Sequence, residues 1–136
     1  MNRRLFMASI AAAIATPKQL LAGGGSIDYT PGLVNDRLAA GETVLVDYAA
    51  SWCGVCKRQE RVIEKLRAEN PKLDENITFI RVDWDQYGSH EVTRSRKVPR
   101  RSTLLLLRGE DELGRIVAGV STDKIKALLE LGLTDA

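Results

Sequence analysis

The sequence predicts a single α/β domain, on two observations. Short apolar runs of strand length alternate along the chain with segments whose apolar residues recur at helical spacing, which is typical of α/β proteins. The chain has 136 residues, of which 44% are hydrophobic. That length supports one domain with a substantial core and is too short for two ordinary domains.

The first 22 residues are predicted to be an export signal rather than part of this domain. A basic start at Arg3 and Arg4 precedes an apolar run rich in alanine, Leu5 to Ala15, and small residues follow up to Ala22. This progression is typical of a secretory signal. The apolar run is too short to span a bilayer, which favours cleavage over permanent anchoring. We therefore expect residues 1–22 to be removed and residues 23–136 to form the mature domain, with cleavage after Ala15 as the alternative.

The residues Arg3-Arg4-Leu5-Phe6-Met7 resemble a twin-arginine export signal, which implies export after folding. An ordinary export signal that happens to begin with two arginines is the alternative. Both predict a location outside the cytoplasm, in the periplasm or an equivalent space.

A helix and a central strand are expected first in the domain. Thr30 is suited to cap a helix and Pro31 to occupy its first position, with Gly41 ending it after about Ala40. The run from Thr43 to Ala49 is apolar and β-branched, so it predicts a buried strand, in which Asp47 is out of place.

A longer helix follows Cys53 and stops at Asn70-Pro71, because a residue before proline is disfavoured in helical conformation. Beyond it we expect a strand, then a further helix or loop, then two strands and a closing helix capped by Ser121 or Thr122. Their expected bounds are Ile77 to Val82, Thr103 to Leu107, Arg115 to Ala118 after a turn over Gly109 to Gly114, and Thr122 to Leu131.

The two cysteines of the chain, Cys53 and Cys56, form one Cys-x-x-Cys. A disulfide across so short a loop removes little entropy from the unfolded chain. A tetrahedral zinc site usually needs four ligands, and His90 is the only histidine. Redox chemistry is therefore the leading interpretation of the pair, and no metal site is expected.

The segment Val44-Leu-Val-Asp-Tyr-Ala-Ala-Ser-Trp-Cys-Gly-Val-Cys-Lys57 resembles the active-site segment of the thioredoxin family. The resemblance continues through residues 77–86 and 103–131. It implies the thioredoxin fold, a central mixed β-sheet flanked by helices on both faces. It also implies thiol–disulfide exchange with protein substrates and no bound cofactor.

Each cysteine has an expected role. At a helix start, the Cys53 sulfur would lie near unpaired amides and the positive end of the helix dipole, which lowers the pKa of its thiol. Cys53 would attack a substrate disulfide and Cys56 would resolve the mixed disulfide. The resemblance assigns Asp47 as the proton acceptor for Cys56, with Arg81 as its counter-ion and a pKa raised by burial. A purely structural aspartate is the alternative.

The expected substrate-binding residues are Trp52, as an apolar wall, and Gly54 and Val55 between the cysteines, together with the loop residues Arg101, Ser102 and Thr103. Two departures from the family are visible. Val55 stands where thioredoxin has proline, and the dipeptide between the cysteines influences the reduction potential. An ungapped alignment also puts Ser102 where the family has a cis-proline, and Pro99 would take that place only if the loop had shifted. We prefer the ungapped alignment, because Thr103 and the four leucines after it match without an insertion.

Charge gives little guidance on partners. The formal net charge is +2, and loss of Arg3, Arg4 and Lys18 with the acid-free leading segment leaves −1, which gives no argument for nucleic-acid binding. The approach to the third strand is basic over residues 94–108. This run is either a solvated loop or a group of charges that lowers the thiol pKa and favours acidic partners.

The expected function is therefore disulfide exchange with proteins outside the cytoplasm, by a monomer. A reductant recharged by a membrane electron donor is favoured over a disulfide oxidant or isomerase. The alternative from another class is a module that binds copper(I) between Cys53 and Cys56, since soft thiolates suit that ion. A redox-inert binding domain is the third possibility, against which the intact cysteine pair argues.

Overall fold

The computed structural model describes residues 25–134, and over this range five strands form one sheet in the spatial order β1-β3-β2-β4-β5. β1 and β2 run parallel to β3, whereas β4 is antiparallel to β2 and β5 is antiparallel to β4. The sheet is therefore mixed, as predicted. The strands are β1 (Ile27–Asp28), β2 (Thr43–Ala49), β3 (Ile77–Asp83), β4 (Thr103–Arg108) and β5 (Asp111–Val117). The predicted signal segment, residues 1–22, lies outside the described residues.

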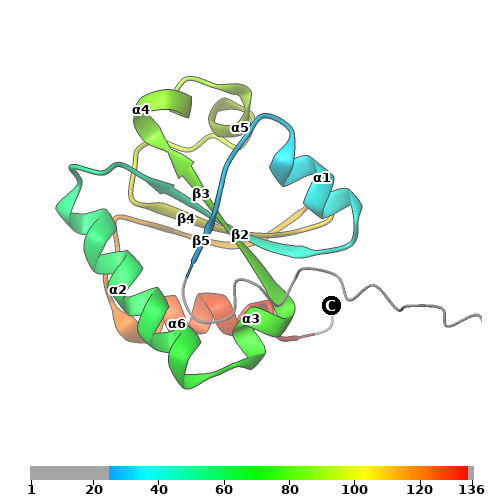
Figure 1. Cartoon of the computed structure of the whole chain (residues 1–136), viewed down its shortest axis with the longest axis vertical. Coiled ribbons are helices and arrows are strands. Elements are labelled where there is room, and N and C mark those ends of the chain that lie inside the picture. The colour runs from blue at the N-terminus through cyan, green and yellow to red at the C-terminus, as the bar shows by residue number, and fades with distance from the viewer. Residues whose placement is uncertain (1–24, 135–136) are drawn as a thin grey trace, which may run out of the picture.

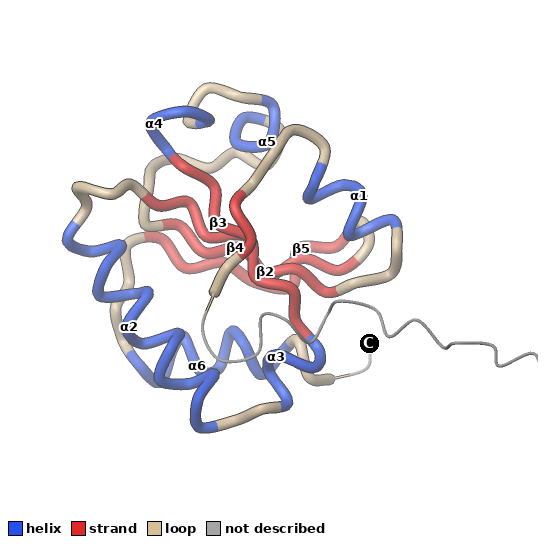
Figure 2. The backbone as a smooth tube through the Cα atoms, viewed as in Figure 1, coloured by secondary structure: helices blue, strands red, loops and turns tan. Residues whose placement is uncertain are grey.

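Helices cover both faces of the sheet (Figure 1), and the tube in Figure 2 shows the strands as a middle layer between them. One apolar cluster joins the sheet to α1, α4 and α5, and a second joins the opposite face to α2, α3 and α6. The predicted fold class is confirmed. The helices are α1 (Leu33–Ala39), α2 (Gly54–Glu69), α3 (Lys72–Asn76), α4 (Trp84–Tyr87), α5 (Glu91–Arg94) and α6 (Thr122–Leu131).

The central strand β2 explains why its sequence is continuously apolar. Val44, Val46 and Tyr48 pack into the cluster with α1, whereas Leu45 packs into the cluster with α2 and α6. All seven residues of β2 are buried, because helices cover both of its faces. Side chains alternate between the two faces along a strand, and Asp47 lies two residues after Leu45. Its carboxyl group therefore points to the same face as Leu45, into the layer between the sheet and α2.

The start of α1 differs from the prediction. The helix begins at Leu33, with Gly32 as its N-cap at φ 90°. Thr30 and Pro31 belong instead to a turn, in which the Leu33 amide donates to the Thr30 carbonyl at 3.0 Å. Proline at the second position of a turn and a glycine with positive φ at the third are the requirements of a type II turn. The sequence signal for a helix start was therefore a turn signal. The predicted ends of α1 at Gly41 and of α2 before Asn70-Pro71 agree with the structure.

Strand β5 also starts earlier than predicted, at Asp111 rather than Arg115. Only Gly109 and Glu110 separate it from β4, and Gly109 has the positive φ, 59°, that such a tight hairpin requires. The last residues of the predicted turn, Asp111 to Gly114, lie on an exposed edge strand, where charged side chains are common. The two-residue strand β1 was not predicted, because it is too short to show a pattern. Over residues 25–134, no helix is both long and apolar enough to cross a membrane.

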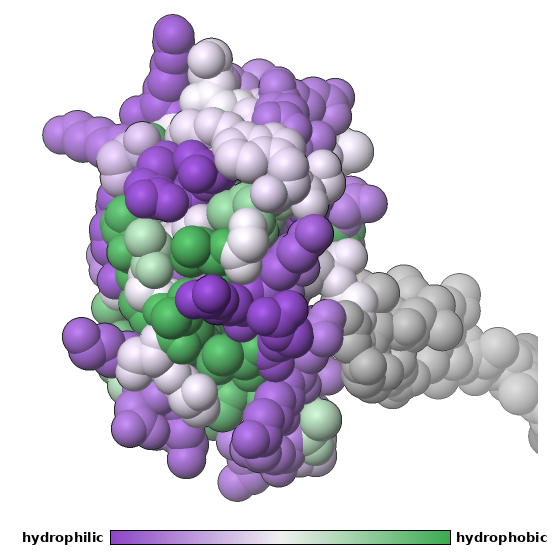
Figure 3. Space-filling model, turned by 90° about the vertical axis from the view of Figure 1, so that its left-hand side faces the viewer, coloured by the Kyte–Doolittle hydropathy of each residue, from purple (hydrophilic) through white to green (hydrophobic). Residues whose placement is uncertain are grey.

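The carboxyl end of β2 and the start of α2 lie together at the left of Figure 1. Figure 3 views the molecule from that side and shows an apolar patch surrounded by hydrophilic side chains. The end of the segment between β2 and α2 carries Cys53, and the first turn of α2 carries Cys56.

Candidate active site

The two cysteines lie at the amino end of α2. Cys53 is the N-cap residue, and its Sγ accepts a hydrogen bond from the Cys56 backbone N–H at 3.2 Å. Cys56 follows in the first turn of the helix. Both thiols are free, and both residues are buried, with 3% of Cys53 and none of Cys56 exposed. The helix start thus supplies an amide donor directly to the Cys53 sulfur, as the sequence predicted.

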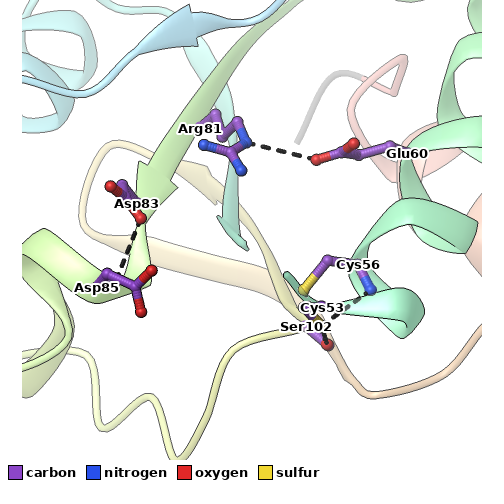
Figure 4. Close-up of polar contacts among 7 residues, drawn as sticks. All are labelled: Cys53, Cys56, Glu60, Arg81, Asp83, Asp85 and Ser102. Atoms are coloured by element: carbon purple, nitrogen blue, oxygen red, sulfur yellow. Dashed lines mark hydrogen bonds and ion pairs between the residues drawn. The ribbon is translucent and has the colours of Figure 1, made fainter. Parts of the chain in front are cut away.

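Ser102 contacts both cysteines and lies next to them in Figure 4. Its Oγ is 3.1 Å from the Sγ of Cys53 and 3.1 Å from the Sγ of Cys56. Pro99 is exposed and lies three residues before it in the chain. Ser102, and not Pro99, therefore occupies the position opposite the cysteines. Its φ is 64°, in the left-handed region, and the peptide bonds of the described residues are all trans.

The two thiols have opposite pKa shifts. Burial raises the pKa of Cys53, but hydrogen bonds from Cys56, Ser102 and Arg101 outweigh it and lower the pKa to about 7. Burial and the hydrogen bond to Cys53 raise the pKa of Cys56. Cys53 is therefore the thiol that ionises near neutral pH, and Cys56 stays protonated there.

Asp47 lies behind the cysteines, 6% exposed, and its Oδ1 has no hydrogen-bond partner. Burial, and after it the nearby Glu60 carboxylate, raise the pKa of Asp47 to about 7, although Arg81 opposes them. Arg81 does not serve Asp47 alone, because its Nε lies 3.4 Å from the Glu60 carboxylate (Figure 4). Asp47, Glu60 and Arg81 line a pocket of about 180 Å³, which leads from the buried carboxyl group towards solvent.

The expected substrate-binding residues lie around this centre. Trp52 is 57% exposed, and its Nε1 donates to both carboxylate oxygens of Asp85 at 3.0 Å. The Arg101 guanidinium stacks on the Trp52 ring, 4.5 Å from its centroid. The rim of the site is thus a fixed aromatic surface with a cation over it.

The remaining predicted contact residues differ in exposure. Gly54 is exposed and Val55 is half-buried, so both can meet a docked chain. Thr103 is fully buried, and its hydroxyl donates to the Arg100 carbonyl at 2.7 Å. The Thr103 side chain therefore stabilises the conformation of the loop and does not contribute to the surface that a substrate would contact.

Three residues of the site were missed by the sequence reasoning: Gln59, Glu60 and Asp85. Gln59 is fully buried, and its Nε2 donates to the carbonyls of Ser102 and Gly119, both at 2.9 Å. A polar residue on the apolar stripe of α2 between Cys56 and Ile63 was the available signal. For Glu60 and Asp85 there was none, because their partners come from other elements. Within residues 25–134, no three His, Cys, Asp or Glu side chains gather as a metal site would require.

Comparison with known proteins agrees with this geometry. The thioredoxin family model matches residues 30–131. Thioredoxin H2-1 of rice is 36% identical over 83 residues, which cover 61% of this chain but only 55% of the rice protein. The thioredoxin of Mycolicibacterium smegmatis is 33% identical over 101 residues, 74% of this chain and 84% of the relative. Among solved structures, Trxlp of Edwardsiella tarda EIB202 matches with a TM-score of 0.66 and 31% identity, over 76% of this chain and 98% of that one.

A cysteine pair at the start of a helix, on this sheet, defines a thiol–disulfide oxidoreductase. The chain belongs to the thioredoxin family.

Proposed function

We propose that this protein is an exported thioredoxin that reduces disulfides of other proteins outside the cytoplasm. The observation that carries the proposal is the difference in pKa between the two thiols. Cys53, stabilised by a backbone amide, ionises near neutral pH, whereas Cys56 beside it stays protonated. A reducing direction is favoured by Asp47, whose raised pKa suits it to accept the proton of Cys56 during release of the substrate.

The proposed reaction has two steps. The Cys53 thiolate attacks one sulfur of a substrate disulfide; an S–S bond forms to that sulfur, and the other substrate sulfur leaves and takes up a proton. Asp47 then accepts the proton of Cys56, and the Cys56 sulfur attacks Cys53. The bond between Cys53 and the substrate breaks, and the second substrate sulfur leaves as a thiolate and takes up a proton. Two electrons pass to the substrate, and the protein ends with a Cys53–Cys56 disulfide.

The surface beside the sulfurs is suited to bind protein substrates. Trp52, Val117 and Val120 are large apolar side chains that are exposed. Val117 and Val120 stand on either side of two residues whose backbone groups form hydrogen bonds with Ser102 and Gln59. These hydrogen bonds place Val117 and Val120 next to the cysteines. An unfolded or extended chain could cover this surface while its disulfide meets Cys53. We propose that the protein acts as a monomer and that a membrane protein returns electrons to it, since an oxidising space does not.

Catalysed reduction of insulin tests this function. With dithiothreitol as the electron source, the protein should accelerate insulin reduction, and its potential against glutathione should lie near that of thioredoxin, about −270 mV. A potential near about −120 mV, with catalysed oxidation of reduced proteins, would make it an oxidant. Absence of exchange in both directions would contradict the proposal.

Export is predicted separately from the charged start and the apolar run of residues 1–22. Amino-terminal sequencing of the protein from fractionated cells should give Gly23 as the first residue, in a fraction outside the cytoplasm. If the signal is of the twin-arginine type, replacing Arg3 and Arg4 by lysine should block export. An intact Met1 in the soluble cytoplasmic fraction would contradict this prediction.

A further inference from the structure

The Ser102 hydroxyl is the polar group closest to both sulfurs at once. It lies 3.1 Å from each, and Ser102 has no exposed surface. A hydroxyl has one hydrogen to donate and lone pairs to accept with. Between one thiolate and one thiol, it can therefore donate to the thiolate and accept from the thiol. Figure 4 shows Ser102 next to Cys53 and Cys56, away from the Arg81–Glu60 pair.

We propose that Ser102 is a positioning residue whose hydroxyl donates a hydrogen bond to the Cys53 thiolate and accepts one from Cys56, and thereby stabilises the reduced pair selectively. This inference deepens the proposed function and rests on it. It holds for exchange in either direction, because it concerns the equilibrium between the two forms of the pair.

The backbone holds this hydroxyl in place. A left-handed φ is uncommon for serine and persists only where the surroundings impose it. Three hydrogen bonds do so here: the Ser102 amide donates to the Tyr48 carbonyl at 2.7 Å, and the Ser102 carbonyl accepts from Ala118 at 2.8 Å and from Gln59 at 2.9 Å. These bonds tie the loop to the end of β2, to the end of β5 and to α2. The Ser102 Cβ is thus directed at the sulfurs by the fold.

The hydroxyl discriminates between the two redox forms because only one of them carries charge. A hydrogen bond to an ionised acceptor is stronger than one between neutral groups, and more so in a buried site. In the disulfide both sulfurs are neutral, so this contribution is lost on oxidation. The electron count is that of the proposed reaction: an S–S bond forms between Cys53 and Cys56, one breaks in the substrate, and the hydroxyl keeps its proton. The hydroxyl therefore makes the pair less strongly reducing than it would be without it.

Two variants separate the hydroxyl from the backbone. Ser102→Ala removes the hydroxyl and keeps a Cβ at positive φ, whereas Ser102→Gly removes the hydroxyl and relieves that conformation. Ser121→Ala is the control, because the hydroxyl that it removes caps α6 by accepting from the Lys124 amide and is not bonded to either sulfur. The charged and titratable groups acting on Cys53, which are Arg101, Cys56 and Asp47, are unchanged in all three.

In both Ser102 variants, the acid dissociation constant of Cys53 should fall about tenfold, measured by iodoacetamide alkylation against pH. The equilibrium with glutathione should move about tenfold towards the protein disulfide, which is a potential lower by about 30 mV. Ser121→Ala should change neither quantity. The two cysteines are the only ones in the chain, so both measurements report this pair alone.

Unchanged alkylation and potential in both variants would overturn the inference. A change in Ser102→Ala that is absent from Ser102→Gly would also overturn it, because the backbone would then be the cause. Failure of the proposed function is distinguishable: the wild-type protein would then not catalyse insulin reduction or oxidation, whatever its response to substitution of Ser102.

Discussion

The Cys56→Ser variant is expected to accumulate mixed disulfides through Cys53 with its natural partners. The Cys53 sulfur keeps its amide donor and its contact with Ser102, so attack on a substrate disulfide is retained. The second step is lost, because no thiol remains one helical turn away to displace the substrate. The complexes should run as high-mass species on non-reducing gels and release their partners on addition of dithiothreitol.

The matched control is Cys53→Ser, which keeps Cys56 and should trap almost nothing. Cys56 has a raised pKa and no exposed surface, so it is a poor nucleophile at neutral pH. Both variants should lose turnover of insulin. Equal trapping by the two variants, or none by Cys56→Ser, would show that nucleophile and resolving cysteine have been assigned wrongly.

The Asp47→Asn variant is expected to slow release of the substrate on the order of 100-fold. The shape of the buried side chain is retained, but the group that accepts the Cys56 proton is lost. Attack by Cys53 should be little affected, so single-turnover experiments should show the mixed disulfide forming normally and decaying slowly. The pH dependence of decay near neutrality, which reports Asp47, should disappear. Unchanged decay across the pH range would remove Asp47 from the mechanism.

The same variant should be more stable than wild type at alkaline pH. The pKa of Asp47 is about 7 in the folded protein, against about 3.9 for an unfolded aspartate, so the folded state binds the extra proton between these values. Stability of the wild type therefore falls as pH rises from about 4 to about 7, and the penalty is fully present above that range. Asparagine removes it, so urea denaturation should show a gain roughly 2.5 kcal/mol larger near pH 8 than near pH 5.

The Glu60→Gln variant tests what raises the pKa of Asp47. Glu60 raises the pKa of Asp47 and also engages Arg81, so its neutralisation should lower the Asp47 pKa by both routes. The stability of Glu60→Gln should therefore decline with pH over a lower range than that of the wild type. An unchanged range would mean that burial alone sets the titration of Asp47.

The centre of the site could be predicted from the sequence because it lies in one continuous segment. Asp47, Trp52, Cys53 and Cys56 occupy the end of β2 and the start of α2, so their spacing along the chain fixes their arrangement in space. Ser102 was placed by aligning β4, a strand whose four leucines leave little freedom of register.

What the sequence could not predict depends on contacts between distant segments. The hydrogen bond between Trp52 and Asp85 joins residues 33 positions apart in the sequence, and the one between Gln59 and Gly119 joins residues 60 positions apart. The left-handed conformation of Ser102 likewise results from bonds to three other elements, and serine has no intrinsic preference for it. The start of α1 was misplaced for a local reason, since proline occurs both in turns and at helix starts and only Gly32 distinguishes the two.

The most direct test of the central claim is alkylation of the fully reduced protein with limiting iodoacetamide, with the modified cysteine identified by peptide mass and the rate followed against pH. The account predicts that Cys53 reacts first, with a rate that rises through a pKa of about 7, and that Cys56 reacts only at much higher pH. Modification of Cys56 first, or a Cys53 rate that rises only near the value of a free thiol, about 8.5, would contradict it.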